Sequence, residues 1–119
     1  MRNFRNLSVW SKGHLLTLKI YSLTKSYPKD EIFGLASQMR RCAYSIPSNI
    51  AEGCGRNSTP DFKRFLVIAA GSSSELEYQL FLSKDLGYIS GIIFKELEFE
   101  TIEIKKMIYS LIKKLDADG

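Results

Sequence analysis

Few residues of this chain are of the types that carry catalysis. His14 is the only histidine among 119 residues. It lies near the start of the first predicted helix, where we expect a surface or groove residue rather than a general base. Ser72, Ser73 and Ser74 are consecutive but have no activating partner, so we interpret them as small residues at a tight helix crossing. The sequence predicts no enzymatic activity and no cofactor.

Metal binding is disfavoured by the same scarcity of ligands. No pair of histidines or cysteines has the two- to four-residue spacing of a zinc site. A ferritin-like carboxylate site needs Glu-x-x-His motifs inside the bundle, and the chain contains none. We therefore predict no metal site.

The two cysteines, Cys42 and Cys54, are predicted to be free thiols. If both lie on one helix, twelve residues separate them by about 18 Å, too far for a disulfide. Cys42 falls on an apolar stripe and is expected to be an inert core residue, whereas Cys54 is expected to be partly exposed and somewhat reactive. Free cysteines indicate a reducing cytoplasm, and neither a signal peptide nor a membrane span is predicted.

Basic residues are the remaining candidates for a function. Residues 1–64 hold 11 Lys and Arg against 4 Asp and Glu, a balance of +7, whereas residues 65–119 have a balance of −3. This asymmetry is a reason to consider an anionic partner such as nucleic acid. The predicted nucleic-acid-binding residues are Arg40, Arg41, Arg56, Lys63, Arg64, Lys12 and Lys19. An ordinary solvated surface is the alternative. We interpret the glycine-containing loop at residues 52–59 as a helix C-cap followed by an N-cap, and the alternative is that free amides of the helix start beside Arg56 hold one phosphate.

Apolar periodicity predicts an all-α chain with one domain over residues 1–119. Helices are expected at residues 8–25, 30–54, 60–86 and 91–115. Short connections between them indicate an antiparallel up-down-up-down four-helix bundle. Pro47 is expected to kink the second helix, although a division into two helices there is the alternative.

Local signals mark the ends of the third helix and the character of its middle. Thr59 is a possible N-cap and Pro60 suits the first turn, while Gly87 suits the C-terminal cap. The middle, residues 69–74, consists of small side chains, for which we expect close approach of a neighbouring helix. The helices at residues 8–25 and 91–115 show more apolar surface than a lone bundle needs, which predicts a homo-oligomer.

A set of short motifs then resembles a known family. The motifs are Trp10, Tyr27-Pro28, Gly34-Leu35, Arg40-Arg41, Ser45-Ile46-Pro47-Ser48-Asn49-Ile50-Ala51-Glu52-Gly53, Gly55-Arg56, Gly71-Ser72, Glu75-Leu76 and Leu86-Gly87-Tyr88. They cover roughly residues 8–115 and are similar to the four-helix bundle proteins encoded in intervening sequences of bacterial 23S rRNA genes.

The resemblance implies an antiparallel bundle that assembles as a homopentameric barrel, with a basic surface associated with nucleic-acid binding. Similar proteins serve as accessory subunits of diversity-generating retroelements, where they partner a reverse transcriptase and RNA. The resemblance brings no enzymatic activity. Asn49, Glu52, Ser72 and Glu75 recur on the helices at residues 30–54 and 60–86, and we interpret them as a structural polar cluster.

Two functions follow from the sequence. The first is a non-enzymatic oligomeric scaffold that binds RNA through its basic surface without reading sequence. The alternative is a protein-interaction module that docks a partner such as a reverse transcriptase and does not bind nucleic acid directly.

Overall fold

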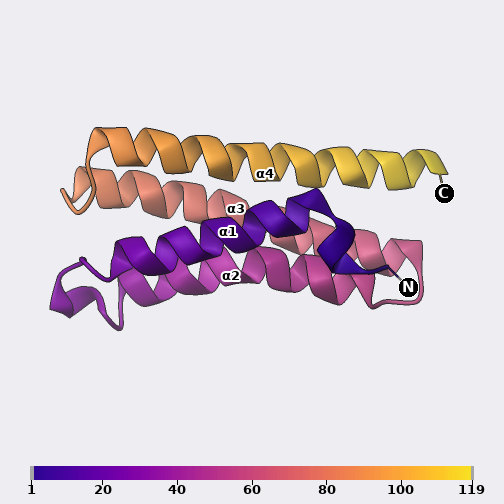
Figure 1. Ribbon diagram of the computed structural model, residues 1–119, viewed down its shortest axis with the longest axis horizontal. Helices are drawn as coiled ribbons and strands as arrows, with labels where there is room; N and C mark the ends of the chain where they lie inside the picture. The colour runs from indigo at the N-terminus through magenta and orange to yellow at the C-terminus, as the bar shows by residue number, and fades with distance from the viewer. Residues whose placement is uncertain (1, 119) are drawn as a thin grey trace.

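The computed structural model describes residues 2–118, which form four long helices and no strands. The helices are α1 (Ser8–Thr24), α2 (Leu35–Cys54), α3 (Thr59–Asp85) and α4 (Gly91–Asp118), and two 3-10 turns are η1 (Phe4–Asn6) and η2 (Lys29–Glu31). Successive helices run in opposite directions along a rod of 46 × 23 × 19 Å (Figure 1). The all-α class and the antiparallel four-helix arrangement are confirmed.

Capping groups mark both ends of α3 close to where local signals placed them. The N-cap of α3 is Ser58 rather than Thr59, because the Ser58 hydroxyl accepts a hydrogen bond from the Asp61 N–H at 3.2 Å. Gly87 follows α3 with φ of +80°, the left-handed conformation that glycine adopts without strain. The Tyr88 N–H returns to the Ser83 carbonyl at 2.9 Å. The turn into α4 is therefore set by Gly87.

The start of α2 differs from the prediction. Asp30 and Glu31 lie in η2, and the helix begins only at Leu35. The Glu31 carboxylate nevertheless serves the helix from outside, because its Oε1 accepts the Leu35 N–H at 3.0 Å while its Oε2 accepts the Tyr88 hydroxyl at 2.8 Å. The acidic residue therefore correctly indicated a nearby helix start, which its side chain caps, but the residue itself lies outside the helix.

Pro47 lies inside α2, which continues through it as one helix. Proline has no N–H, so the Ala43 carbonyl four residues earlier loses its helical donor. The buried hydroxyl of Thr17 on α1 lies 3.0 Å from that carbonyl oxygen and 2.8 Å from the Gly13 oxygen. A neighbouring helix therefore supplies the donor that Pro47 removes, and α2 is not divided in two.

Glycines at two places in the bundle have opposite surroundings. A Cβ at Gly53 would lie 2.8 Å from Phe62 Cδ1 and 3.0 Å from Phe65 Cβ, so glycine allows α2 and α3 to approach closely there. A Cβ at Gly71, in the small-residue middle of α3, would meet no atom within 4 Å. The expected tight crossing in this segment holds for the buried Ala69 and is wrong for Gly71, which faces outward.

The core lies along the contacts that α2 makes with α1 and α3 and that α3 makes with α4, whereas α1 and α4 make the sparsest contact among the four pairs of neighbouring helices. Its largest fully buried side chains are Phe62, Leu16, Ile20, Met39, Ile46, Ile50, Leu66, Leu76, Leu80, Ile104, Ile108 and Thr101. Apolar side chains also remain outside: Leu15 on α1 is 55% exposed and Phe99 on α4 is 68% exposed. No helix within residues 2–118 has a stretch long and apolar enough to cross a membrane.

Candidate nucleic-acid interface

Three of the predicted basic residues gather where α2 ends and α3 begins. Asp61 on the first turn of α3 accepts a hydrogen bond from Arg64 Nε at 3.0 Å, and Arg64 Nη2 also lies 3.0 Å from the same oxygen, Oδ1. Asp61 pairs with Arg56 Nε at 3.7 Å. Arg56 also lies 3.5 Å from Glu52, one turn back on α2. Lys63 pairs with Asp116 near the C-terminal end of α4. Two arginines therefore share one aspartate at this end of the bundle.

The guanidinium groups at this end rest on aromatic rings. Arg56 and Arg64 lie 4.7 Å and 4.4 Å from the centroid of the Phe65 ring, and Arg2 lies 4.6 Å from that of Phe62. All three arginines are exposed. Stacking on a ring holds a cation at the surface with one face open, which suits contact with a phosphate or a base.

Arg2 was not among the predicted residues. The N-terminal segment reaches the end of α2 because the Arg2 N–H donates to the Cys54 carbonyl at 3.1 Å. No helical period extends over residues 2–6, so the only sequence signal was the presence of cations there. We call Arg2, Arg56, Lys63 and Arg64 the basic end.

The other predicted cations on α1 and α2 lie elsewhere and have different partners. Lys12 pairs with Glu103 at 3.0 Å and Lys19 with Glu100 at 2.9 Å, and both pairs join α1 to α4. Arg40 holds α2 to the end of α1, because its Nε donates to Thr24 Oγ1 at 2.8 Å and its guanidinium lies over the Tyr21 ring. These three residues are not brought together with the basic end.

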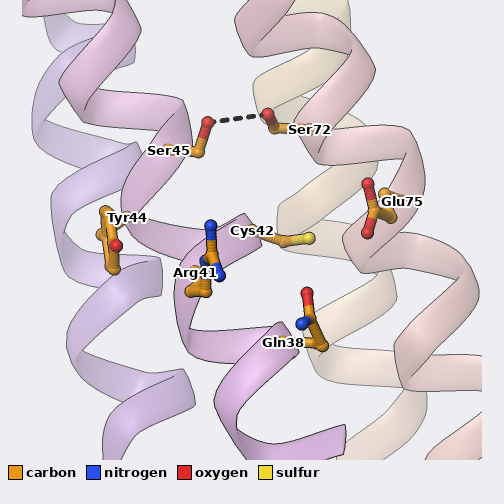
Figure 2. A pocket seen from close by; sticks show the side chains of 7 residues that line it. All are labelled: Gln38, Arg41, Cys42, Tyr44, Ser45, Ser72 and Glu75. Carbon is orange, nitrogen blue, oxygen red and sulfur yellow. Dashed lines mark hydrogen bonds between the residues drawn. The ribbon is translucent and has the colours of Figure 1, made fainter.

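Arg41 differs from its neighbour Arg40 because it turns to the other side of α2. It is exposed and forms no ion pair within residues 2–118. It lines an open groove of about 500 Å³ between α2 and α3, shown in Figure 2. The lining residues of this groove are Gln38, Arg41, Cys42, Tyr44, Ser45, Ser72 and Glu75.

The predicted polar cluster is centred on a residue that sequence reasoning missed. The Ser45 hydroxyl lies 2.9 Å from the Ser72 hydroxyl (Figure 2). It also accepts a hydrogen bond from Asn49 Nδ2 at 2.9 Å, so Ser45 joins Asn49 on α2 to Ser72 on α3. Glu75 lies nearly one turn beyond Ser72 in the same groove. Glu52 lies outside this network and pairs with Arg56 instead.

The two cysteines have surroundings that suppress the reactivity of their thiols. Cys54 is buried, which corrects its expected partial exposure, and burial raises the pKa of its thiol. Burial and the neighbouring Glu75 carboxylate raise the pKa of the Cys42 thiol to about 11. Both thiols are free, and His14 stacks on Trp10 with ring centroids 5.3 Å apart. The part of the chain that the structure describes holds no group of three or more metal-ligating side chains.

The fold and the basic end make this chain a small helical-bundle protein with clustered surface cations. Residues 5–110 match the model of the 23S rRNA-intervening sequence protein family, and the chain belongs to that family. It is similar to the crystal structure of a protein of unknown function from the S23 ribosomal protein family of Bacteroides thetaiotaomicron VPI-5482. The identity is 30%, the TM-score is 0.82, and the match covers 88% of this chain and 98% of that one. No curated protein sequence matches the chain.

Proposed function

We propose that this chain is a non-enzymatic, homo-oligomeric scaffold that binds RNA through the basic end, with Arg41 as a further contact. The observation that carries the proposal is the stacking of three exposed guanidinium groups on the rings of Phe62 and Phe65. Arginine presents planar donors to phosphate and an open face to unstacked bases. Membership of a family named for 23S rRNA intervening sequences is consistent with such a ligand.

The ion pairs at the basic end do not prevent this use. Arg56, Arg64 and Asp61 all keep about a third or more of their side chains exposed, and exposed pairs contribute only about 0–1 kcal/mol. A phosphate can therefore displace a shared carboxylate at small cost. Contacts of this kind follow the backbone rather than the base sequence.

The oligomeric part of the proposal is supported by the sparse contact between α1 and α4. Leu15 and Leu18 on α1 and Phe99 on α4 are more than half exposed, so this side of the bundle has apolar surface that a second copy of the chain can cover. The pentameric number comes from the family resemblance alone. The free Cys42 and Cys54 suit a reducing cytoplasm.

The alternative function, docking of a partner protein such as a reverse transcriptase, is favoured by a different feature. Phe33 in the connection between α1 and α2 is 96% exposed, and Ile32 beside it is 54% exposed. Exposed apolar residues on a loop are suited to burial in a partner's pocket. In this case RNA enters the complex through the partner and not through the basic end.

A salt titration of RNA binding with matched variants tests the leading proposal. The test variant is Arg56→Gln with Arg64→Gln, and the control is Lys25→Gln with Lys29→Gln at the opposite end of the bundle. Each pair removes two positive charges, so a difference between them reports position rather than net charge. For single-stranded RNA, we expect the test variant to bind more weakly and to lose about 1.4 from the slope of log K against log salt.

Two results would count against the proposal. Equal weakening by the two double variants would indicate diffuse attraction to a cationic protein. Absence of salt-dependent binding in the unmodified chain, together with loss of partner binding on Phe33→Ser, would favour the docking alternative. The oligomeric part is tested by light scattering on Leu15→Glu with Leu18→Glu, which should lower the mass in solution, because both side chains are exposed in the single subunit.

A further inference from the structure

The groove between α2 and α3 carries two opposite charges that are not paired with each other. Arg41 stands on α2 and Glu75 on α3, and Figure 2 shows the Cys42 sulfur between them. Neither side chain forms an ion pair within residues 2–118, although most carboxylates on α3 and α4 do. Both residues are exposed to solvent.

On the α3 side of the groove, the charged group is a hydrogen-bond acceptor, the Glu75 carboxylate. Gln79, one turn after Glu75, is only 6% exposed, and its Nε2 donates to Glu75 Oε2 at 3.4 Å. A carboxylate only accepts hydrogen bonds, so a ligand seated beside Glu75 should present donors.

On the α2 side of the groove, the charged group is a hydrogen-bond donor, so a ligand there should present acceptors. The guanidinium group of Arg41 offers a planar array of donors and no acceptor. Between the two sides, Ser45 on α2 and Ser72 on α3 form a hydroxyl pair at 2.9 Å that can act as donor or acceptor. The Tyr44 ring also lines the groove and is partly exposed. The complementary ligand is small, carries donors on one edge, and carries acceptors on the adjacent edge.

Guanine is the nucleobase with this arrangement. Its N1–H and N2–H₂ groups donate together to a carboxylate, and its O6 and N7 atoms accept together from an arginine. Adenine would present its N1 acceptor to Glu75, and uracil and cytosine have no adjacent pair of acceptors like O6 and N7. We propose that the α2–α3 groove binds an unpaired guanine, with Glu75 on its Watson–Crick edge and Arg41 on its O6/N7 edge.

This inference rests on the proposed function in one respect, namely that the guanine belongs to an RNA bound by this chain. RNA held at the basic end can place an unpaired base in the groove, since single-stranded RNA is read through splayed bases and their edges. A free guanine nucleotide has the same edges and would bind in the same way. The binding of RNA would then have a base preference in addition to its backbone contacts.

The experiment compares an A10 RNA with the same oligomer carrying one central G, and GMP with AMP, at constant salt. We expect the G-containing RNA and GMP to bind about tenfold or more tightly than their adenine counterparts. Arg41→Ala and Glu75→Gln should each reduce that preference to less than about twofold. Both side chains are exposed and outside the core, and a melting curve on each variant checks the fold. Arg64→Gln is the control, which should weaken both RNAs equally and keep the preference.

The outcomes separate this inference from the proposed function. Salt-dependent RNA binding without a preference for G, with GMP and AMP indistinguishable, overturns the guanine site and leaves the scaffold proposal intact. Binding of GMP that Glu75→Gln abolishes, in a chain that does not bind RNA, supports the site and overturns the RNA scaffold. A preference for G that survives both Arg41→Ala and Glu75→Gln places base recognition elsewhere and overturns the groove assignment.

Discussion

Replacing Thr17 with valine tests how the bundle accommodates Pro47 inside α2. The Thr17 hydroxyl donates to the Ala43 carbonyl at 3.0 Å, and Pro47 cannot supply the N–H that would normally bond there. Valine keeps the shape of threonine and removes only the hydrogen-bonding capacity. The substitution therefore leaves a buried carbonyl oxygen without a donor.

The expected loss follows from that unsatisfied group. A buried acceptor without a partner lowers the free energy of unfolding by about 1–3 kcal/mol. In a Pro47→Ala background, the N–H of residue 47 becomes available to the Ala43 carbonyl, so the same Thr17→Val change should be milder. We expect a coupling free energy of at least about 1 kcal/mol between the two substitutions.

Urea unfolding of the four proteins of this double-mutant cycle, followed by circular dichroism, measures the coupling. All four should be compared at one protein concentration, because oligomerisation makes apparent stability depend on concentration. Thr101→Val is the control: Thr101 is buried on α4 and donates to the Leu97 carbonyl at 2.7 Å, which already has its helical donor. An equal loss for Thr17→Val with and without Pro47, within about 0.5 kcal/mol, would refute the reasoning.

Three further predictions concern packing, thiol reactivity and pH. Gly53→Ala should lower the free energy of unfolding by about 1–3 kcal/mol, because the added Cβ would lie 2.8 Å from Phe62 Cδ1. Gly71→Ala should raise the free energy of unfolding by about 0.5–1 kcal/mol. Urea unfolding that finds Gly53→Ala the more stable of the two variants contradicts this packing. Cys42 and Cys54 should react with a thiol reagent at pH 8 only after unfolding, because burial raises both pKa values; fast labelling of the native chain would contradict it. The Leu35 N–H and the Tyr88 hydroxyl lower the pKa of Glu31 below its ordinary 4.5, so its stabilisation is present above pH 4.5 and is lost as pH falls through the lower folded value. Glu31→Gln should therefore reduce the melting temperature at pH 7 and have a shrinking effect in acid, and a constant difference would count against this role.

Much of the helical architecture was predictable because helix ends are determined by nearby residues. The first helix was expected at residues 8–25 and extends over Ser8–Thr24, and the third was expected at 60–86 and extends over Thr59–Asp85. Proline, glycine and capping side chains act within about one turn, so their signals can be read without the fold. The start of α2 was predicted too early, because Glu31 caps the helix through its side chain while lying in a separate 3-10 turn.

The candidate sites were less predictable, since the partner of a side chain depends on which helices pack together. Arg40 and Arg41 are adjacent in sequence, yet Arg40 is bound to α1 and Arg41 faces the α2–α3 groove. Arg2 reaches the basic end through a backbone hydrogen bond to Cys54, which no local pattern could indicate. Ser45 is the centre of the polar network because α2 packs beside α3 and brings its hydroxyl to that of Ser72, and the sequence alone does not indicate this contact.

The sequence by itself determined the four helices, their apolar faces and the asymmetry of charge, because these depend on residue type and helical period. Only the tertiary structure decided which cations are paired and which glycine is crowded. Gly53 and Gly71 are the same residue in the same kind of helix, but a Cβ at one would meet Phe62 and at the other would meet no atom within 4 Å. The physical reason is that periodicity specifies which residues share a face, whereas the approach of a second helix specifies what that face contacts.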